Sequence, residues 1–113
     1  MESKIAKVKV KDIAQSPQKL RLVADLVRGK DVTKALDILA FANRKGTMTI
    51  SKAIESGIAN AREKYGVEKS ELKIHHISVD EAATFKRARF ASRGRYARIL
   101  KRRSHLNLEL IVK

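Results

Sequence analysis

The residues with the clearest chemical potential are the cations of one stretch, from Ala82 to Leu108. This stretch contains nine Lys and Arg residues and no Asp or Glu. Burying so many unpaired charges costs far more than a protein core can supply, so they must be neutralised by something outside the stretch. A segment of this kind predicts binding to a polyanion. Its cations are Lys86, Arg87, Arg89, Arg93, Arg95, Arg98, Lys101, Arg102 and Arg103.

The type and distribution of these cations favour a nucleic acid as the partner. The rest of the chain contains 17 basic and 12 acidic residues, so the charge surplus is concentrated in this stretch. Arg outnumbers Lys in it by seven to two, and a guanidinium can fork onto phosphate oxygens and stack on bases. A solubilising surface would interleave both signs. A membrane-binding surface would need a clean apolar face, for which the stretch offers only Phe85, Phe90, Tyr96, Ile99 and Leu100.

Metal and catalytic chemistry have weaker candidates in this sequence. His75 and His76 are neighbours, and adjacent residues of a strand point to opposite faces, so we do not expect them to hold a metal ion. Ser104 and His105 are adjacent too, which is not the geometry of a nucleophile and its base. We expect these two residues either to bind nucleic acid or to end the basic segment. The sequence predicts no enzyme, no metal site and no cofactor.

Length and composition fit one domain. The chain has 113 residues, of which 43% are hydrophobic, so it can bury a modest core. With three Phe, two Tyr and no Trp, it is poorly suited to an RNA platform on which bases stack. It has no Cys, no signal-like N-terminus and no apolar run long enough for a membrane span. We therefore expect a cytoplasmic protein with no membrane partner that contacts the backbone and shape of its nucleic acid.

The start of the chain predicts a strand and then a helix. Residues 6–11 alternate between apolar side chains and lysines, which is typical of a half-buried strand with one basic face. The Ser-Pro pair at positions 16–17 is typical of a helix start, because Ser can cap the helix and Pro has no amide to leave unpaired. This helix should run to about Arg28, with Leu22 and Leu26 beside its apolar stripe.

Two further helices are expected in the middle of the chain. Residues 31–42 show helical spacing, with Thr33 as the expected N-cap. After a break at residues 43–46, apolar residues recur every three or four positions until Tyr65. The small residue Gly57 lies on this apolar face and should let another element approach closely, although it weakens the helix.

The second half predicts two strands joined by the basic stretch. Residues 67–71 are polar and are expected to form a surface loop, and residues 72–79 alternate imperfectly as a strand. Residues 106–112 alternate clearly, and this strand should pair antiparallel with residues 72–79. The basic stretch fits either a helix interrupted at Gly94 or a ribbon with two arms that project about 30 Å. The pattern alone leaves both shapes open.

Short motifs along the whole chain resemble those of one family. They are Ser16-Pro17, Lys19, Arg21-Leu22-Val23, Asp25-Leu26, Arg28-Gly29-Lys30, Glu55-Ser56, Ala59-Asn60-Ala61, Val79-Asp80-Glu81, Lys86-Arg87, Gly94-Arg95, Lys101-Arg102 and Ser104-His105. In this order they are highly specific, and the chain resembles the family of large-subunit ribosomal protein twenty-two. The resemblance implies an α+β fold, with three helices packed on a three-stranded antiparallel sheet and a long basic β-hairpin extension. It therefore favours the ribbon over the helix.

The resemblance also implies a function and partners. It implies one domain over residues 1–113, with residues 82–104 as an extended rRNA-binding hairpin. The implied protein is a structural constituent of the large ribosomal subunit that aids early assembly, and its hairpin tip lines the nascent-peptide exit tunnel near the macrolide site. Its partners would be large-subunit rRNA, neighbouring ribosomal proteins and the nascent polypeptide, for a monomer within the cytoplasmic ribosome. The alternative is a free DNA-coating protein of the bacterial chromatin type, because charge alone does not separate the two.

The residues expected to bind rRNA fall into two groups. The first group lies in and just around the first helix and consists of Ser16, Lys19, Arg21, Arg28 and Lys30. The second group lies in the hairpin and consists of Lys86, Arg87, Arg89, Arg93, Arg95, Arg98, Lys101, Arg102, Arg103, Ser104 and His105. The tip expected to line the tunnel consists of Ala88, Arg89, Phe90, Ala91, Ser92 and Arg93. The chain departs from the family at this tip, where Phe-Ala-Ser replaces a common Pro-Arg-Ala.

Overall fold

The computed structural model describes residues 4–42, 44, 46–82, 85–90, 96–101 and 103–113, with backbone only for 85–90 and 96–101. The elements follow in the order β1 (Ile5–Ile13), α1 (Pro17–Val27), α2 (Val32–Phe41), α3 (Thr47–Tyr65), the 3-10 helix η1 (Lys69–Glu71), β2 (Leu72–Glu81), β3 (Phe85–Phe90), β4 (Tyr96–Lys101) and β5 (Ser104–Val112).

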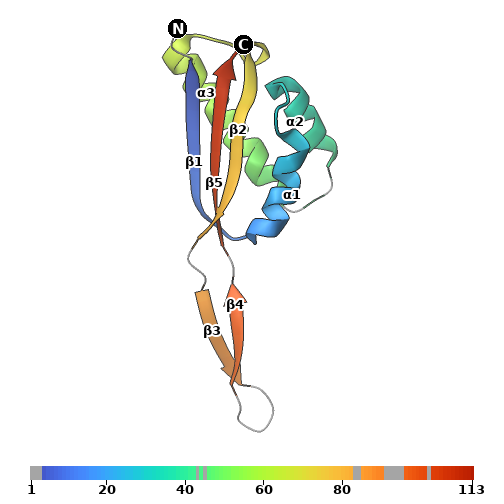
Figure 1. Cartoon of the computed structure of the whole chain (residues 1–113), viewed down its shortest axis with the longest axis vertical. Coiled ribbons are helices and arrows are strands. Elements are labelled where there is room, and N and C mark those ends of the chain that lie inside the picture. Colours follow the sequence, from blue (N-terminus) through green and yellow to red (C-terminus); the bar gives the residue numbers. More distant parts are fainter. Residues whose placement is uncertain (1–3, 43, 45, 83–84, 91–95, 102) are drawn as a thin grey trace.

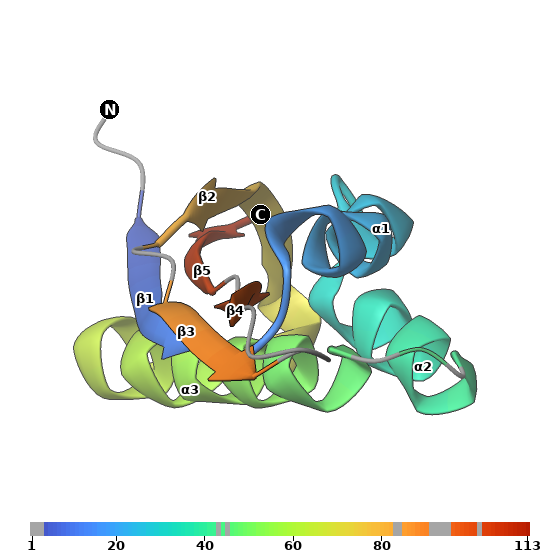
Figure 2. The same ribbon diagram turned by 90° about the horizontal axis from the view of Figure 1, so that it is seen from below.

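The helices pack on a three-stranded antiparallel sheet with the strand order β1-β5-β2. Helix α3 packs against β1 and β5, α1 packs against β2, and α2 packs against both other helices. Figures 1 and 2 show the helices on one side of the sheet and the β3–β4 pair extending away from it. The expected α+β class and the antiparallel pairing of β2 with β5 are therefore confirmed. In the part of the chain that the structure describes, no helix combines the length and the apolar character needed to cross a membrane.

The hydrophobic core lies between the sheet and the helices. The central strand β5 contributes Leu106, Leu108 and Leu110, each at most 1% exposed. Gly57 of α3 faces this strand, and a Cβ atom at position 57 would lie 2.7 Å from Leu110 Cδ1 and 3.4 Å from Val8 Cγ2. The absence of a side chain at position 57 therefore lets the helix approach the sheet closely, as the sequence predicts.

Helix α1 begins and ends close to the predicted positions. Ser16 is its N-cap, and Ser16 Oγ accepts a hydrogen bond from the Lys19 amide at 3.4 Å. Its buried stripe consists of Pro17, Leu20, Val23, Ala24 and Val27. The expectation that Leu22 and Leu26 belong beside this stripe is wrong, because their exposed fractions are 52% and 36%. One face of α1 meets the sheet, and these two leucines lie on the face turned to solvent.

Helix α2 begins earlier than its expected cap. Its N-cap is Asp31, so the prediction that Thr33 caps the helix is wrong. The backbone of Asp31 forms an isolated bridge with Lys73, which holds residue 31 in an extended conformation just before the helix. The Asp31 carboxylate pairs with Lys113 Nζ at 3.2 Å instead of capping the helix. Contacts with the sheet therefore determine where α2 starts.

The segment between α3 and β2 contains a helical turn that the polar pattern did not predict. Residues 69–71 form η1, and its start is held by a reciprocal capping box between Glu68 and Glu71. The Glu68 amide donates to Glu71 Oε2 at 3.0 Å, and Arg62 Nη2 donates to Glu68 Oε2 at 3.1 Å. The expected surface loop is thus a short, exposed but ordered turn.

Two bulges interrupt the alternation of the outer strands. The register of β2 shifts between Ile74 and His76, and His75 and His76 are both exposed. The register of β1 shifts between Val10 and Ile13, and Asp12 has a positive φ of 56°. The inserted residue in β2 explains why its apolar pattern is imperfect.

The basic stretch forms a ribbon rather than a helix in its described parts. β3 and β4 pair antiparallel from Phe85 opposite Lys101 to Phe90 opposite Tyr96. The molecule measures 64 × 28 × 19 Å, and Figure 1 shows that the β3–β4 pair extends along the long dimension. The first three residues of the predicted tip, at positions 88–90, belong to β3, whereas Ala91, Ser92 and Arg93 lie outside the described residues.

Candidate nucleic-acid interface

The hairpin arm carries most of the cations that the sequence assigns to nucleic-acid binding. Lys86, Arg87 and Arg89 lie on β3, and Arg98 and Lys101 lie on β4. Their side chains lie outside the described part of the structure, as do the whole of Arg93, Arg95 and Arg102. The two strands pair with each other over six residue pairs, which satisfies backbone hydrogen bonds within the arm. Such a ribbon can leave the sheet without support from the hydrophobic core.

The root of the arm is fixed to the end of β1 by three side-chain contacts. Ser104 is fully buried, and Ser104 Oγ donates to the Gln15 carbonyl at 2.6 Å. The Asp12 amide donates to His105 Nδ1 at 3.1 Å, which requires the neutral tautomer with its proton on Nε2. Arg103 Nη2 donates to the Asp12 carbonyl. Arg103 and His105 thus hold the bulge of β1 against the start of β5, and Ser104 holds the residues just after β1.

Two arginines predicted to bind rRNA contact the sheet of their own chain. Arg21 Nε and Nη2 both donate to the Val79 carbonyl, at 3.1 and 2.9 Å. Arg28 Nη2 donates to the Ile77 carbonyl at 3.1 Å, and Arg28 Nη1 pairs with Asp25. β2 is an edge strand, and these carbonyls lie on its side away from β5. The two guanidinium groups therefore satisfy acceptors that an open sheet edge would leave unpaired.

The other residues of the first group have different surroundings. The start of α1 lies near the root of the arm, because Ser16 follows Gln15, whose carbonyl holds Ser104. Lys19 and Lys30 are exposed. The Lys30 carbonyl accepts from the Ile74 amide at 3.0 Å, which continues the cover along the edge of β2. The sequence places all five residues in and just around the first helix, but only the structure shows that Arg21 and Arg28 hydrogen-bond to the sheet.

Replacing Arg21 separates its structural contact from a possible contact with RNA. Arg21→Met keeps the aliphatic stem and removes both hydrogen bonds to Val79, so we expect the free energy of unfolding to fall by about 1 to 2 kcal/mol. Chemical denaturation of the full chain measures this loss. Lys19→Met, at an exposed position of the same helix, should change it by about 0.5 kcal/mol or less. Equal losses in both variants would contradict the role of Arg21 at the sheet edge.

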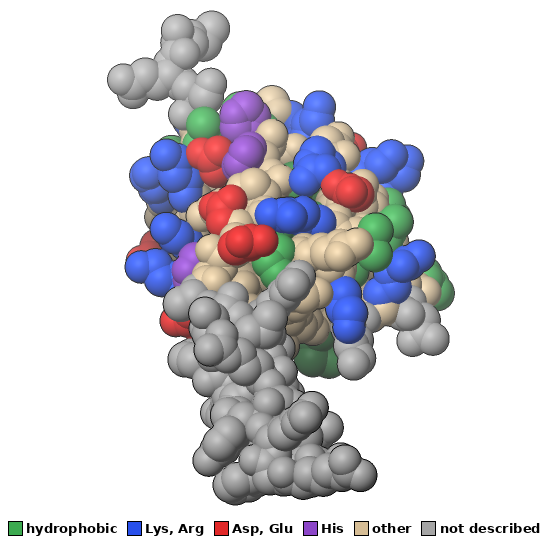
Figure 3. Space-filling view, turned by 60° about the horizontal axis from the view of Figure 1, so that its bottom comes forward, with side chains coloured by type: hydrophobic (Ala, Val, Ile, Leu, Met, Phe, Trp, Pro, Cys, Tyr) green, Lys and Arg blue, Asp and Glu red, His purple; other side chains and the backbone are tan. Residues whose placement is uncertain are grey.

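The outer face of the sheet has both signs of charge. Figure 3 shows basic side chains spread over the visible face of the domain, with acidic side chains among them. Asn107 Nδ2 of β5 donates to Asp80 Oδ2 of β2 at 2.8 Å, and within β2 His76 Nε2 lies 3.2 Å from Ser78 Oγ. Among the described residues, no group of three or more His, Cys, Asp or Glu side chains could hold a metal ion. This face is therefore a polar network and not a uniform cationic surface.

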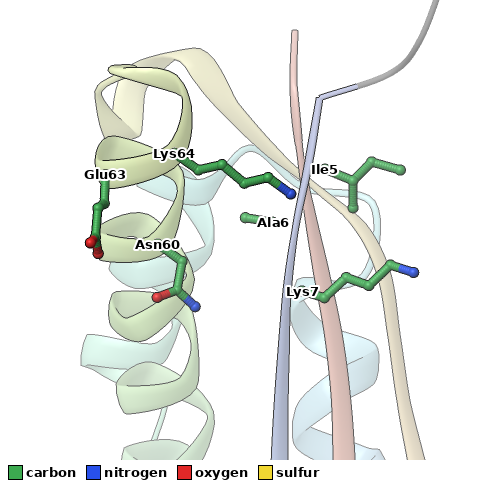
Figure 4. Close-up of a pocket in the computed structure, with 6 residues that line it drawn as sticks. All are labelled: Ile5, Ala6, Lys7, Asn60, Glu63 and Lys64. Atoms are coloured by element: carbon green, nitrogen blue, oxygen red, sulfur yellow. The ribbon is translucent and has the colours of Figure 1, made fainter.

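β1 provides a row of lysines that the sequence prediction of rRNA-binding residues left out. Lys7, Lys9 and Lys11 alternate along β1 and are exposed. Beside the free edge of β1, a groove of about 690 Å³ separates the strand from α3, and Figure 4 shows Lys64 extending across it from α3. The alternation at residues 6–11 predicts this basic face. It does not distinguish lysines that bind RNA from lysines that only keep a sheet edge soluble.

Comparison with known families agrees with the fold and with the basic arm. Residues 8–111 match the family described as ribosomal protein L22p/L17e. The match includes the sheet, the three helices and both strands of the arm. The chain belongs to the ribosomal protein L22p/L17e family and is a structural, rRNA-binding constituent of the large ribosomal subunit.

Proposed function

We propose that residues 82–104 are the arm by which this protein grips large-subunit rRNA, and that the rest of the chain, in the same domain, anchors the arm. The observation that carries the proposal is the segregation of charge. Nine cations and no carboxylate lie between residues 82 and 108, and the backbone between β2 and β5 leaves the core as a two-stranded ribbon. The segment itself contains no carboxylate, and rRNA phosphates would balance its charge.

The arm acts by positioning rRNA and not by chemistry. Each Lys or Arg that meets a phosphate releases counterions, and this release drives binding. Phosphate contacts fix register and orientation without reading sequence. A ribbon that extends along the longest dimension of the molecule can meet rRNA segments that are distant in sequence, and holding them together aids early subunit assembly. We propose two exposed lysines as further contacts, Lys19 on α1 and Lys30 just after it, because within the part of the chain that the structure describes neither side chain bonds to the sheet as Arg21 and Arg28 do.

The tip of the arm is proposed to reach the nascent-peptide exit tunnel near the macrolide site. Ala88, Arg89, Phe90, Ala91, Ser92 and Arg93 would form part of the tunnel wall and would meet the nascent polypeptide. The described tip residues, 88–90, lie at the end of β3 that is farther from the sheet, and this position supports the role. The protein would act as a monomer, with rRNA and neighbouring ribosomal proteins as its partners in the cytoplasmic ribosome.

Cosedimentation tests the proposal against a free DNA-coating protein. We expect the protein to stay with large ribosomal subunits through a high-salt gradient. An arm that is surrounded by rRNA and makes many phosphate contacts should dissociate slowly. Naked DNA of equal mass is the control, since it offers the same charge without the rRNA fold. Release from the subunits together with retention on DNA would reject the proposed function.

A further inference from the structure

The lysine row of β1 leads along the sheet toward the basic arm. We define this row as Lys7, Lys9 and Lys11, whose Cα atoms repeat at roughly 6.6 Å along the strand. All three are exposed; Lys7 and Lys9 share a face of the strand, and Lys11 lies in the bulge between Val10 and Ile13. Figure 1 shows that β1 runs from the far end of the sheet down to the root of the arm. The row is therefore continuous in space with the arm.

The row differs from α1 in the partners of its cations. Lys7 Nζ lies 3.7 Å from Glu109 Oε1, but its side chain is 76% exposed, and an exposed pair at this distance is weak. Lys9 lies opposite Asn107 in the register, which offers no counter-charge. Within the described residues, neither Lys9 nor Lys11 has a carboxylate within 4.0 Å. Arg21 and Arg28, by contrast, donate to carbonyls of β2.

The two edges of the sheet are also unequal. The edge of β2 is covered by arginines of α1 and by the hydrogen bond between Ile74 and Lys30. The edge of β1 borders a groove, and Tyr65 Oη donates to the Ile5 carbonyl of this strand at 3.1 Å. The alternative explanation for lysines on an edge strand is that they prevent pairing with another strand and bind nothing. That reading does not require three exposed like charges in succession along a strand that leads to an arm proposed to bind RNA.

We infer that the row is a second rRNA contact, separate from the arm, in which a segment of rRNA backbone runs along the outer face of β1. The charge complementarity and the continuity with the arm favour RNA over an added protein strand. Because the occupant is rRNA, this inference rests on the proposed function. The row extends the phosphate contacts from the arm onto the globular part, and so fixes the direction in which the arm enters the rRNA.

The salt dependence of binding tests the row directly. The full-length K7Q/K9Q/K11Q variant is titrated with protein-free large-subunit rRNA from the source organism at several salt concentrations. Three lost phosphate contacts should reduce the slope of log K against log salt by about 2 to 3, taking 0.7 to 0.9 per contact. The matched control is K34Q/K52Q/K69Q, which removes the same charge from exposed positions on α2, α3 and η1. The slope of this control should stay close to that of the wild type.

The possible outcomes separate the row from the proposed function. A wild-type chain without affinity for rRNA would reject the proposed function itself. Wild-type binding with equal slopes for the two triple variants would overturn the row alone. Thermal unfolding shows whether K7Q/K9Q/K11Q remains folded. If this variant does not fold, the single variant Lys9→Gln is titrated instead, and the slope should fall by about 0.7 to 0.9. K7Q/K9Q/K11Q could also keep the wild-type slope while reconstituted subunits lose a neighbouring protein. The row would then contact that protein and not rRNA, which would also overturn the inference.

Discussion

A variant without the arm should fold cooperatively and lose most of its salt-dependent affinity for rRNA. The Ala82 amide donates to the Arg103 carbonyl at 3.0 Å, so these residues already face each other across the root. Replacing residues 83–102 by Asn-Gly should close β2 and β5 with a two-residue hairpin turn. The deletion removes Lys86, Arg87, Arg89, Arg93, Arg95, Arg98, Lys101 and Arg102. The described core residues all lie outside the deleted segment, which is why folding should persist.

The measurement is the rRNA affinity of both proteins between 50 and 200 mM salt. A wild type with about 6 to 10 phosphate contacts should lose roughly a thousandfold or more over this range. The armless variant keeps about five proposed contacts, namely the row of β1 with Lys19 and Lys30. Its remaining slope of about 3.5 to 4.5 should therefore cost it only about a hundredfold to five hundredfold in affinity. Both values take the duplex-DNA relation as a guide.

A variant with an uncharged arm shows whether the arm binds rRNA through its charge or through its shape. A control that keeps residues 83–102 but replaces its eight cations by Gln should bind as weakly as the armless variant. Wild-type affinity in this control would mean that the ribbon contacts RNA by shape and not by charge. Loss of cooperative unfolding in the armless variant would instead show that the arm contributes to the core.

The helices and strands of this fold were predictable because each buries one face, and its apolar residues recur with the period of that helix or strand. Residues of β1, β5 and α3 alternate or recur in step with that face, so the strand and helix types follow from the sequence. Leu22 and Leu26 were assigned wrongly because composition does not say how wide the buried stripe of α1 is. The bulges at Asp12 and His75 insert a residue without a composition signal, and only the pairing with β5 reveals them.

The position of the basic arm was predictable from the sequence, but the contacts of each cation were not. A block of charge without acids is visible in the sequence at residues 82–108. Whether an Arg meets RNA or the chain's own backbone depends on which carbonyls lie nearby, and this is a tertiary property. Arg21 follows the helical pattern of a basic surface, yet its guanidinium satisfies the edge of β2. Ser104 is polar beside a basic segment, yet it is fully buried at the root of the arm.

Shortening Leu110 should destabilise the domain strongly and reverse the effect of a change at Gly57. Leu110 is fully buried on the central strand, so Leu110→Ala should lower the free energy of unfolding by about 2 to 5 kcal/mol. This is a large part of the roughly 5 to 15 kcal/mol typical of such domains. Gly57→Ala alone should cost up to about 2 kcal/mol, because its Cβ would lie 2.7 Å from Leu110 Cδ1 and the better helix propensity offsets only part of the crowding.

In the Leu110→Ala background the same Gly57→Ala change should stabilise the protein by about 1 kcal/mol. The crowding atoms of Leu110 are then absent, the next neighbour is Val8 Cγ2 at an ordinary 3.4 Å, and the gain in helix propensity remains. Urea denaturation of the two single variants, the double variant and the wild type measures the coupling. Leu106→Ala is the matched control, since it creates a cavity on the same strand and should leave Gly57→Ala destabilising. A destabilising Gly57→Ala in every background would contradict the close approach of α3 to β5. None of these variants changes a charge, so those that remain folded should keep the wild-type salt dependence of rRNA binding, which separates the contacts that hold the fold from those that hold the RNA.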